Sequence, residues 1–259
     1  MRTRYRHAER SGSGVSAAVA VVGIHESSPR SRQAHDSVRG RVAMEEYAAV
    51  IGNLTSLRVT RLSLADCTET DVVDRLCAVD ANVGIALVVG MNAAHSQAIA
   101  RHVDGRGGPA VVTEIDLATA TMAASVLSTL SHRGISPSRG RVILACPERA
   151  PLLGPVLIEC GVGSVTSWSI HDAQDFSLRR LLTHNDVLVD LSDSESRVGG
   201  EIEGSITLGS DPVAAVSLAL TGLLDALDRR TLPRVDVPVL AACARALNHL
   251  ETSGLQPSR

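Results

Sequence analysis

Carboxyl groups that could serve acid–base chemistry stand at the end of a short apolar segment. Glu114 and Asp116 follow this segment and precede a long helical pattern, with Thr119 one turn further on. In an open α/β sheet such a position lines the ligand crevice, where two carboxylates can act as acid and base or hold a cation. Asp116 also has a structural explanation, because Asp is strongly preferred at helix N-termini. We favour the capping role, and Thr119 is equally well explained as a ligand contact or as a buried hydroxyl.

Imidazole groups form a second set of acid–base candidates, because histidine titrates near neutral pH. His25 and His35 each precede an acidic residue in or near a long polar stretch, which suits a proton relay. His95 stands near the start of another helical pattern. A solvated loop contains the same residues without any chemistry, and we favour that explanation for the two loop histidines. The candidate catalytic residues of a shared crevice are therefore Glu114, Asp116, His95 and His25.

A cysteine and two arginine pairs are weaker candidates. Cys146 ends a predicted strand before a helix, a position that can activate a thiol. Its basic neighbour is Arg149 alone, so a buried structural thiol is the favoured explanation. The arginine pairs at residues 179–180 and 229–230 can hold a small anionic ligand or a partner. Arginines near helix ends also complement the carbonyl groups there, and we favour that role.

The composition excludes several classes of chemistry. Every one of the 25 basic residues is an arginine, since the chain has no lysine. This excludes a Schiff-base lysine, a lysine general base and the lysine of a phosphate-binding P-loop. Aromatic residues make up 2% of the chain, which disfavours single-stranded nucleic-acid binding because that depends on stacking. The net charge of −3 gives no electrostatic reason to expect nucleic acid or an anionic membrane as a partner.

The cysteines and the N-terminal segment favour a cytoplasmic protein. The 5 cysteines are scattered without a CxxC motif or metal-type spacing, as is typical of a reducing compartment. An arginine-rich start followed by the apolar residues 15–24 is similar to a signal peptide, but no small-x-small cleavage site follows. No stretch reaches the ~18 apolar residues of a membrane span, so no membrane partner is expected.

Hydrophobic periodicity predicts an α/β protein in which strands and helices alternate and the sheet is parallel. Residues 1–14 are predicted to form a disordered basic tail, and residues 26–40 a long polar loop. Strands are predicted at residues 15–24, 57–64, 83–89, 109–113, 141–146, 164–169, 186–191 and 204–208. Helices are predicted at residues 68–78, 93–103, 116–132, 150–160, 176–182, 212–227 and 235–250.

Several short motifs follow one another in a set order along the chain. They are Gly-Arg-Val-Ala-Met at residues 40–44, Leu-Ser-Leu-Ala-Asp at 62–66, Thr-Glu-Ile-Asp-Leu-Ala-Thr-Ala at 113–120, and a strand–turn–helix over 141–162. In this order they resemble the malic enzymes in their short bacterial form: a glycine-lysine strand, a Leu-Asp-Thr-Lys-Asp strand, a metal-binding helix entry and a nucleotide-binding turn. The resemblance implies a smaller N-terminal α/β lobe over residues 15–115. A Rossmann-like lobe with C-terminal helices would follow over residues 116–259.

The chain departs from this family at the residues that the resemblance makes catalytic. Arg41 stands where the family has its lysine base, and a guanidinium stays protonated and cannot accept a proton. The family's tyrosine acid has no counterpart, since Tyr5 lies in no matching context. Val88, Val89 and Ile115 stand at the places of three metal-binding carboxylates. Because hard cations need charged oxygen ligands, Mg²⁺ or Mn²⁺ is not expected.

The nucleotide-binding turn departs from the family as well. Its three glycine positions are Ala145, Pro147 and Ala150, although glycines there let the backbone approach a diphosphate and donate N–H groups. Pro147 removes a donor, and Glu148 adds a negative charge. Ser169 stands in place of the acid that holds the ribose. NAD(P) is therefore not expected as a cofactor.

Fold and function separate easily, and the sequence predicts a catalytically degenerate malic-enzyme-like protein with a binding, assembly or regulatory role. A small anionic ligand and a homodimer or partner protein are the expected partners. One alternative is a repurposed metal-free and NAD-free enzyme, of lyase, isomerase or hydrolase type, that uses the same crevice. A second alternative is residual NAD(P)-dependent malate oxidation.

Overall fold

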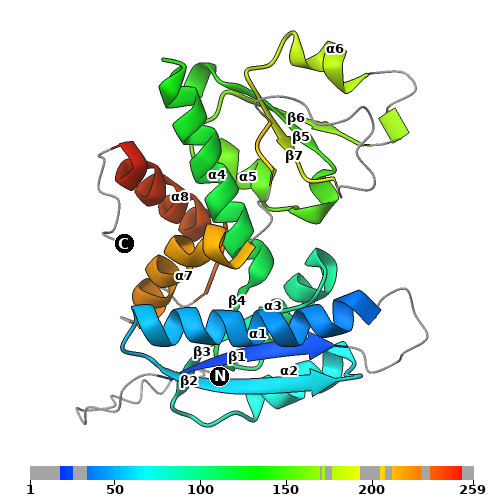
Figure 1. Cartoon of the computed structure of the whole chain (residues 1–259), viewed down its shortest axis with the longest axis vertical. Coiled ribbons are helices and arrows are strands. Elements are labelled where there is room, and N and C mark those ends of the chain that lie inside the picture. Colours follow the sequence, from blue (N-terminus) through cyan, green and yellow to red (C-terminus); the bar gives the residue numbers. More distant parts are fainter. Residues whose placement is uncertain are drawn as a thin grey trace, which may run out of the picture.

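The structure is a computed structural model that describes residues 18–25, 34–169, 171–172, 177–192, 205–207, 212–228 and 234–252. It contains two parallel sheets, and helix α4 (Glu114–His132) runs from the first sheet towards the second (Figure 1). The α/β class with parallel sheets is thereby confirmed. The tail expected at residues 1–14 lies outside the described residues.

The first sheet has the strand order β2-β1-β3-β4, and every pair in it is parallel. Alternation along β1 sends Val19 and Val21 towards the core around helix α1, and Ala20 and Val22 towards the core under helices α2 and α3. The sheet is thus covered on both faces, as its long apolar strands require. Its elements are β1 (Ala18–His25), α1 (Ala34–Leu54), β2 (Arg58–Ala65), α2 (Glu69–Cys77), β3 (Val83–Val89), α3 (Ala93–Gly105) and β4 (Ala110–Thr113).

The second sheet has the order β6-β5-β7 and is also parallel. Trp168 packs with Ile143 and Leu188 in a small cluster beneath helix α6. Ile206 forms an isolated parallel bridge to Val189. Of the strand expected at residues 204–208, residues 205 and 207 have no regular structure, and residues 204 and 208 are not described. The elements are β5 (Arg141–Ala145), α5 (Leu153–Glu159), β6 (Ser164–Trp168), α6 (Leu178–Leu182) and β7 (Val187–Asp190), with short 3₁₀ turns η1 (Pro137–Arg139) and η2 (Pro147–Arg149).

One hydrophobic core joins the two sheets. It extends from α1 through α4 to β5 and β7, and includes the inner faces of α7 (Pro212–Asp228) and α8 (Val237–Thr252). Helix α7 packs against α4, α8, α1 and β3, and α8 also packs against α4 and α5. In Figure 1 these two helices lie beside α4, between the sheets. Within the described residues no helix combines the length and apolar character needed to span a bilayer.

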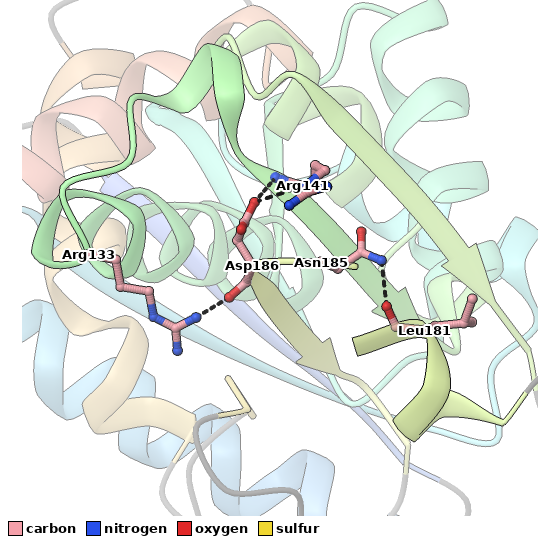
Figure 2. A network of polar contacts seen from close by, with 5 residues as sticks. All are labelled: Arg133, Arg141, Leu181, Asn185 and Asp186. Carbon is pink, nitrogen blue, oxygen red and sulfur yellow. Dashed lines mark hydrogen bonds and ion pairs between the residues drawn. The ribbon is translucent and has the colours of Figure 1, made fainter. Parts of the chain in front are cut away.

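Asp186 ties the amino-terminal edge of the second sheet to the end of α4 (Figure 2). Its carboxylate Oδ2 accepts the backbone N–H of Arg141 at 2.8 Å, and Arg141 Nε lies 3.5 Å from the same oxygen. Its carbonyl oxygen accepts a hydrogen bond from Nη1 of Arg133, which follows α4. Next to it, Asn185 donates to the carbonyl of Leu181 at 2.8 Å. These contacts fix where α4 ends relative to β5 and β7.

The polar loop expected at residues 26–40 and the strand expected at residues 40–44 are both wrong where the structure describes them. Helix α1 begins at Ala34 and runs through the whole of the second segment. The reason is visible in its buried side chains, which recur at helical spacing: Ala43, Met44, Tyr47, Ala48 and Ile51. Residues 26–33 are not described.

Candidate functional site

The candidate site is the carboxyl edge of the first sheet. The chain passes from β1 to β2 on one side of β1, and then returns to form β3 on its other side. The direction in which successive strands are added to the sheet therefore reverses between β1 and β3. Ligand crevices of open α/β sheets lie at such a switch point. The residues at this edge are His25 at the end of β1, Gly90 after β3, and Glu114 after β4.

Helix α1 rests directly on the backbone of this edge, and glycine makes that contact possible. A Cβ atom on Gly40 would lie 2.2 Å from the carbonyl oxygen of Ile24. Gly90 adopts φ +84°, and a Cβ there would lie 2.6 Å from the same oxygen and 2.9 Å from Gly40 Cα. Such distances exclude any side chain, so α1, β1 and β3 meet at van der Waals contact. Arg41, the residue after Gly40, lies exposed on α1.

Asp116 performs the structural role that the sequence favoured, but as the third residue of the helix. Thr113 is the N-cap of α4, and its hydroxyl accepts the Asp116 backbone N–H at 3.1 Å. Asp116 Oδ2 in return accepts the Thr113 N–H at 2.9 Å and its hydroxyl at 2.7 Å. Burial raises the pKa of Asp116 above its usual value, while the hydrogen bonds from Thr113 act to lower it. The carboxylate is therefore committed to a reciprocal cap.

Glu114 reaches across the edge of the sheet. Its Oε2 lies 3.5 Å from the backbone N–H of Gly90, and its side chain is half-buried. Gly90 itself lies against the carbonyl of Ile24, the residue before His25. Glu114 and His25 are therefore placed on two sides of one glycine, although no hydrogen bond joins them within the described part of the chain.

Two polar atoms near this edge are enclosed without a hydrogen-bond partner among the described residues. One is Nδ1 of the half-buried His25, and the other is the hydroxyl of the fully buried Thr119. Other hydroxyls on α4 donate to the carbonyl four residues earlier: Thr121 to Leu117 at 2.9 Å, and Thr129 in the same way. An enclosed polar atom with no partner costs free energy, so each of these atoms needs a further group, such as an ordered water, to satisfy it.

His95 makes no polar contact with the other candidates among the described residues. It lies exposed in the first turn of α3, where its backbone N–H donates to Asn92, the N-cap of the helix. Its Nε2 lies 3.4 Å from Glu69 Oε1 on α2. Among the described residues, no hydrogen bond or ion pair joins any two of the four candidates His25, His95, Glu114 and Asp116. The structure thus leaves His25 and Glu114 at the edge, Asp116 in a cap and His95 at the surface.

The donor set at this edge does not fit a divalent cation. Val88 and Val89 are buried in β3, and Ile115 is half-buried at the start of α4. None of these side chains can supply the charged oxygens that Mg²⁺ or Mn²⁺ require. No group of three or more His, Cys, Asp or Glu side chains that could hold a metal occurs in the described ranges.

The carboxyl edge of the second sheet is built differently. After β5 the chain turns at Cys146, which adopts the left-handed backbone conformation with φ 57° and ψ 54°. Asp190 ends β7 with its carboxylate nearly buried, and Oδ1 accepts from the N–H and hydroxyl of Ser192 at 3.0 and 2.5 Å. Ser169 after β6 donates its N–H to Asp172 at 2.8 Å. The polar groups of this edge therefore bond to one another.

Sequence reasoning missed two features of the site. Thr113 is the true cap, and its signal was the Thr-x-x-Asp spacing with Asp116. The contact of Gly40 and Gly90 with Ile24 had no signal in the sequence, because it joins three segments far apart in the chain.

We compared the chain with known proteins by sequence and by structure. No protein-family model and no curated protein sequence matches the chain. Among solved structures, the malic enzyme of Entamoeba histolytica has a TM-score of 0.67 at 12% identity, over 92% of this chain and 64% of that one. The malic enzyme of Pyrococcus horikoshii gives 0.58 at 13% identity, over 93% and 78%. The NAD-dependent malic enzyme of Thermotoga maritima gives 0.56 at 13%, over 90% and 84%.

The likeness concerns the arrangement of the chain. It extends over both sheets, and the chain spans under two thirds of the length of the Entamoeba enzyme. At identities of 12% and 13% this likeness shows the fold alone. This chain has an α/β fold similar to that of the malic enzymes.

Proposed function

We propose that this protein keeps the malic-enzyme fold without its oxidative decarboxylation, and acts by binding, assembly or regulation. The observation that supports this most strongly is how the polar groups of the first sheet edge are used. Asp116 caps its own helix, and His95 lies at the surface beside Glu69. Arg41, at the place expected for a lysine base, carries a guanidinium that cannot accept a proton.

The metal chemistry of the reaction has no support in the described residues either. Decarboxylation leaves an enolate whose negative charge a divalent cation stabilises as a Lewis acid. The positions where the resemblance places the metal ligands hold the apolar side chains of Val88, Val89 and Ile115. The edge therefore has apolar side chains at the positions where the reaction needs charged oxygen ligands for the metal.

What remains at the edge suits the binding of a small anionic ligand. His25 Nδ1 and the Thr119 hydroxyl are enclosed and lack partners among the described residues. Both atoms can donate a hydrogen bond, the histidine when that nitrogen is protonated. An anion or a carboxylate would satisfy both atoms when they act as donors. If the role of the protein is assembly instead, we propose that it forms an interface with a second copy of the chain or with a partner protein.

Two measurements test the proposal. Purified full-length protein is given malate, Mn²⁺ and NAD or NADP, and reduction of the nicotinamide is followed by absorbance. We expect no turnover; turnover that is lost in Arg41→Ala would establish residual malate oxidation instead. Native mass spectrometry of protein purified from its source reports bound small molecules and subunits together. A retained ligand or an oligomer supports the proposal, and a bare monomer contradicts it.

A repurposed metal-free enzyme is the second candidate, and one observation favours it. His25 and Glu114 flank Gly90, so an imidazole and a carboxylate stand on two sides of the switch point. Such a pair can move a proton without a metal. The test is to supply a small molecule that the purified protein retains and to measure its conversion. We expect the wild type to convert it, and neither His25→Gln nor Glu114→Gln to do so. Conversion by both variants at the wild-type rate would exclude these residues.

A further inference from the structure

We infer that the turn after β5 is closed by its own hydrogen bonds and serves as a structural brace for α8, so that the second sheet takes no dinucleotide. In a Rossmann-type site, free N–H groups at the start of the helix after the first strand hold the diphosphate. The residues that would supply these groups here are 146–155, between β5 and the first turn of α5.

Prolines remove three of these donors. Pro147, Pro151 and Pro155 recur at every fourth position through the segment. A proline has no backbone N–H, and its ring adds bulk where a diphosphate would have to approach. Pro155 occupies the first turn of α5, where a helix otherwise exposes free donors.

Most of the other N–H groups in the segment are already bonded. Cys146 donates to Trp168 O at 2.9 Å, Arg149 to Cys146 O at 3.2 Å, and Ala150 to Pro147 O at 3.1 Å. Leu153 donates to the carbonyl of Ala150 at 2.9 Å. These bonds close two successive turns upon themselves. A diphosphate would have to break them to gain the donors that a glycine-rich turn leaves free.

Three N–H groups of the segment have no described partner. They belong to Glu148 in the 3₁₀ turn, Leu152 at the N-cap of α5 and Gly154 in its first turn. Glu148 is exposed and places a carboxylate beside the turn. Asp190 brings a second carboxylate to the edge from β7. Two negative groups oppose an anionic ligand at this position.

The C-terminal end of α5, which follows this segment, is held against the terminal helix. Arg245 of α8 donates to the carbonyl of Glu159 at 3.1 Å. The Cys160 thiol lies 3.7 Å from the carbonyl of Ala241 on α8. A stiff turn with three prolines limits the freedom of α5 in the unfolded chain and fixes its direction in the folded one. The turn thereby fixes the start of α5, and the end of α5 contacts α8.

Site-resolved hydrogen exchange tests the inference on the full chain. The amides of Arg149, Ala150 and Leu153 should exchange slowly in the free protein, and excess NAD or NADP should leave their protection unchanged. Rapid exchange of these amides that slows on adding either dinucleotide would overturn the inference.

Calorimetric titration and thermal unfolding give a second readout, with Pro147→Gly as the comparison variant. A site filled at about a hundredfold excess over its Kd would raise the Tm by several degrees. We expect no saturable heat and no Tm shift with NAD or NADP for either protein. Pro147→Gly should lower the Tm and speed exchange at Ala150 several-fold, because the brace loses its stiffness. Dinucleotide binding by the wild type, or a Tm unchanged by the substitution, would contradict the inference, whereas binding by Pro147→Gly alone would assign the exclusion to Pro147.

This inference concerns a different sheet from the proposed function and fails separately from it. NAD bound without malate turnover would overturn the closed turn and leave the proposed function standing. Turnover of malate would overturn the proposed function whatever the exchange rates in the turn.

Discussion

The carboxyl edges of the two sheets occupy equivalent places in the topology but differ in what their polar groups do. At the first edge, His25 Nδ1 and the Thr119 hydroxyl have no partner among the described residues. At the second edge, the turn after Cys146 bonds to itself and Asp190 bonds to Ser192. A switch point therefore becomes a binding site only where donors or acceptors are left over after folding.

The same contrast appears in the residues that shape the two edges. Glycines at positions 40 and 90 bring the backbone of α1 into contact with β1 and β3. Prolines at positions 147, 151 and 155 keep the backbone of the second edge stiff and poor in N–H groups. The structure of the first edge depends on close contact between backbone segments, and that of the second depends on the restricted backbone conformation of its prolines. Substitutions that reverse either property test the comparison.

The largest effect is expected from Gly40→Ala. The new Cβ would lie 2.2 Å from the Ile24 carbonyl oxygen, so α1 must move away from the first edge. We expect a loss of about 3 kcal/mol in the free energy of unfolding, measured by urea denaturation. Gly52→Ala on the same helix is the control, because nothing lies within 4 Å of its Cβ position. It should gain about 0.5–1 kcal/mol from helix propensity. Equal effects of the two substitutions would refute the close contact.

Asp116→Ala removes the carboxylate from the cap of α4 and should cost about 2 kcal/mol. Asp116→Asn keeps a hydrogen-bond acceptor without the charge and should cost less. Burial raises the pKa of Asp116 in the folded protein, so the folded state holds the proton more tightly than the unfolded state. The stability that this gives is present below the usual Asp pKa and is lost as the pH rises through the folded value.

The pH dependence separates the two Asp116 variants. Over the acid range above the usual Asp pKa, the wild type should lose stability relative to Asp116→Asn, which carries no titrating group. The check is urea denaturation of both proteins at a series of pH values. A constant difference between them across that range would show that the carboxyl group titrates alike in both states.

The sequence predicted the strands well where burial leaves a simple pattern. The apolar run at residues 83–89 matches β3, because a strand covered on both faces needs continuous apolar residues. It predicted α1 poorly, since polar residues precede Gly40 and hide the helical spacing of Met44 and Tyr47. A sequence pattern reports only the local preference of a segment for helix or strand. Helix α1 was missed because it is stabilised by contacts with β1, β2 and α7, which lie elsewhere in the chain.

The site was predictable in its residue types and less so in its roles. Thr68 and Asp71 form a capping box on α2, and the same spacing at Thr113 and Asp116 forms one on α4. The sequence therefore contained the structural role of Asp116. It could not place Glu114 Oε2 beside the Gly90 N–H, because 24 residues separate them and the strand order decides the contact.

A smaller effect is expected at the opposite edge of the second sheet. Asp186→Ala removes the acceptor of the Arg141 N–H, a contact of 2.8 Å that is drawn in Figure 2. The carboxylate is partly exposed, so we expect a loss of about 1 kcal/mol by urea denaturation. Asp74→Ala is the control, since it breaks an exposed ion pair between Asp74 on α2 and Arg106 at the end of α3. A loss at Asp186 no larger than at Asp74 would mean that the backbone contact contributes nothing.

The smallest and most informative effect is expected from Thr119→Val. Valine has the same shape without the hydroxyl, so the variant removes a buried polar atom that has no partner among the described residues. We expect the free energy of unfolding to rise by less than about 1 kcal/mol. Thr113→Val is the control, because its hydroxyl caps α4 and its loss should destabilise the protein. If Thr119→Val also destabilises the protein, the hydroxyl bonds to a ligand, a water or another segment of the chain. Repeating the measurement on protein stripped of small molecules then separates these: a cost that disappears identifies a ligand at the first edge, and one that persists assigns the hydroxyl to the fold.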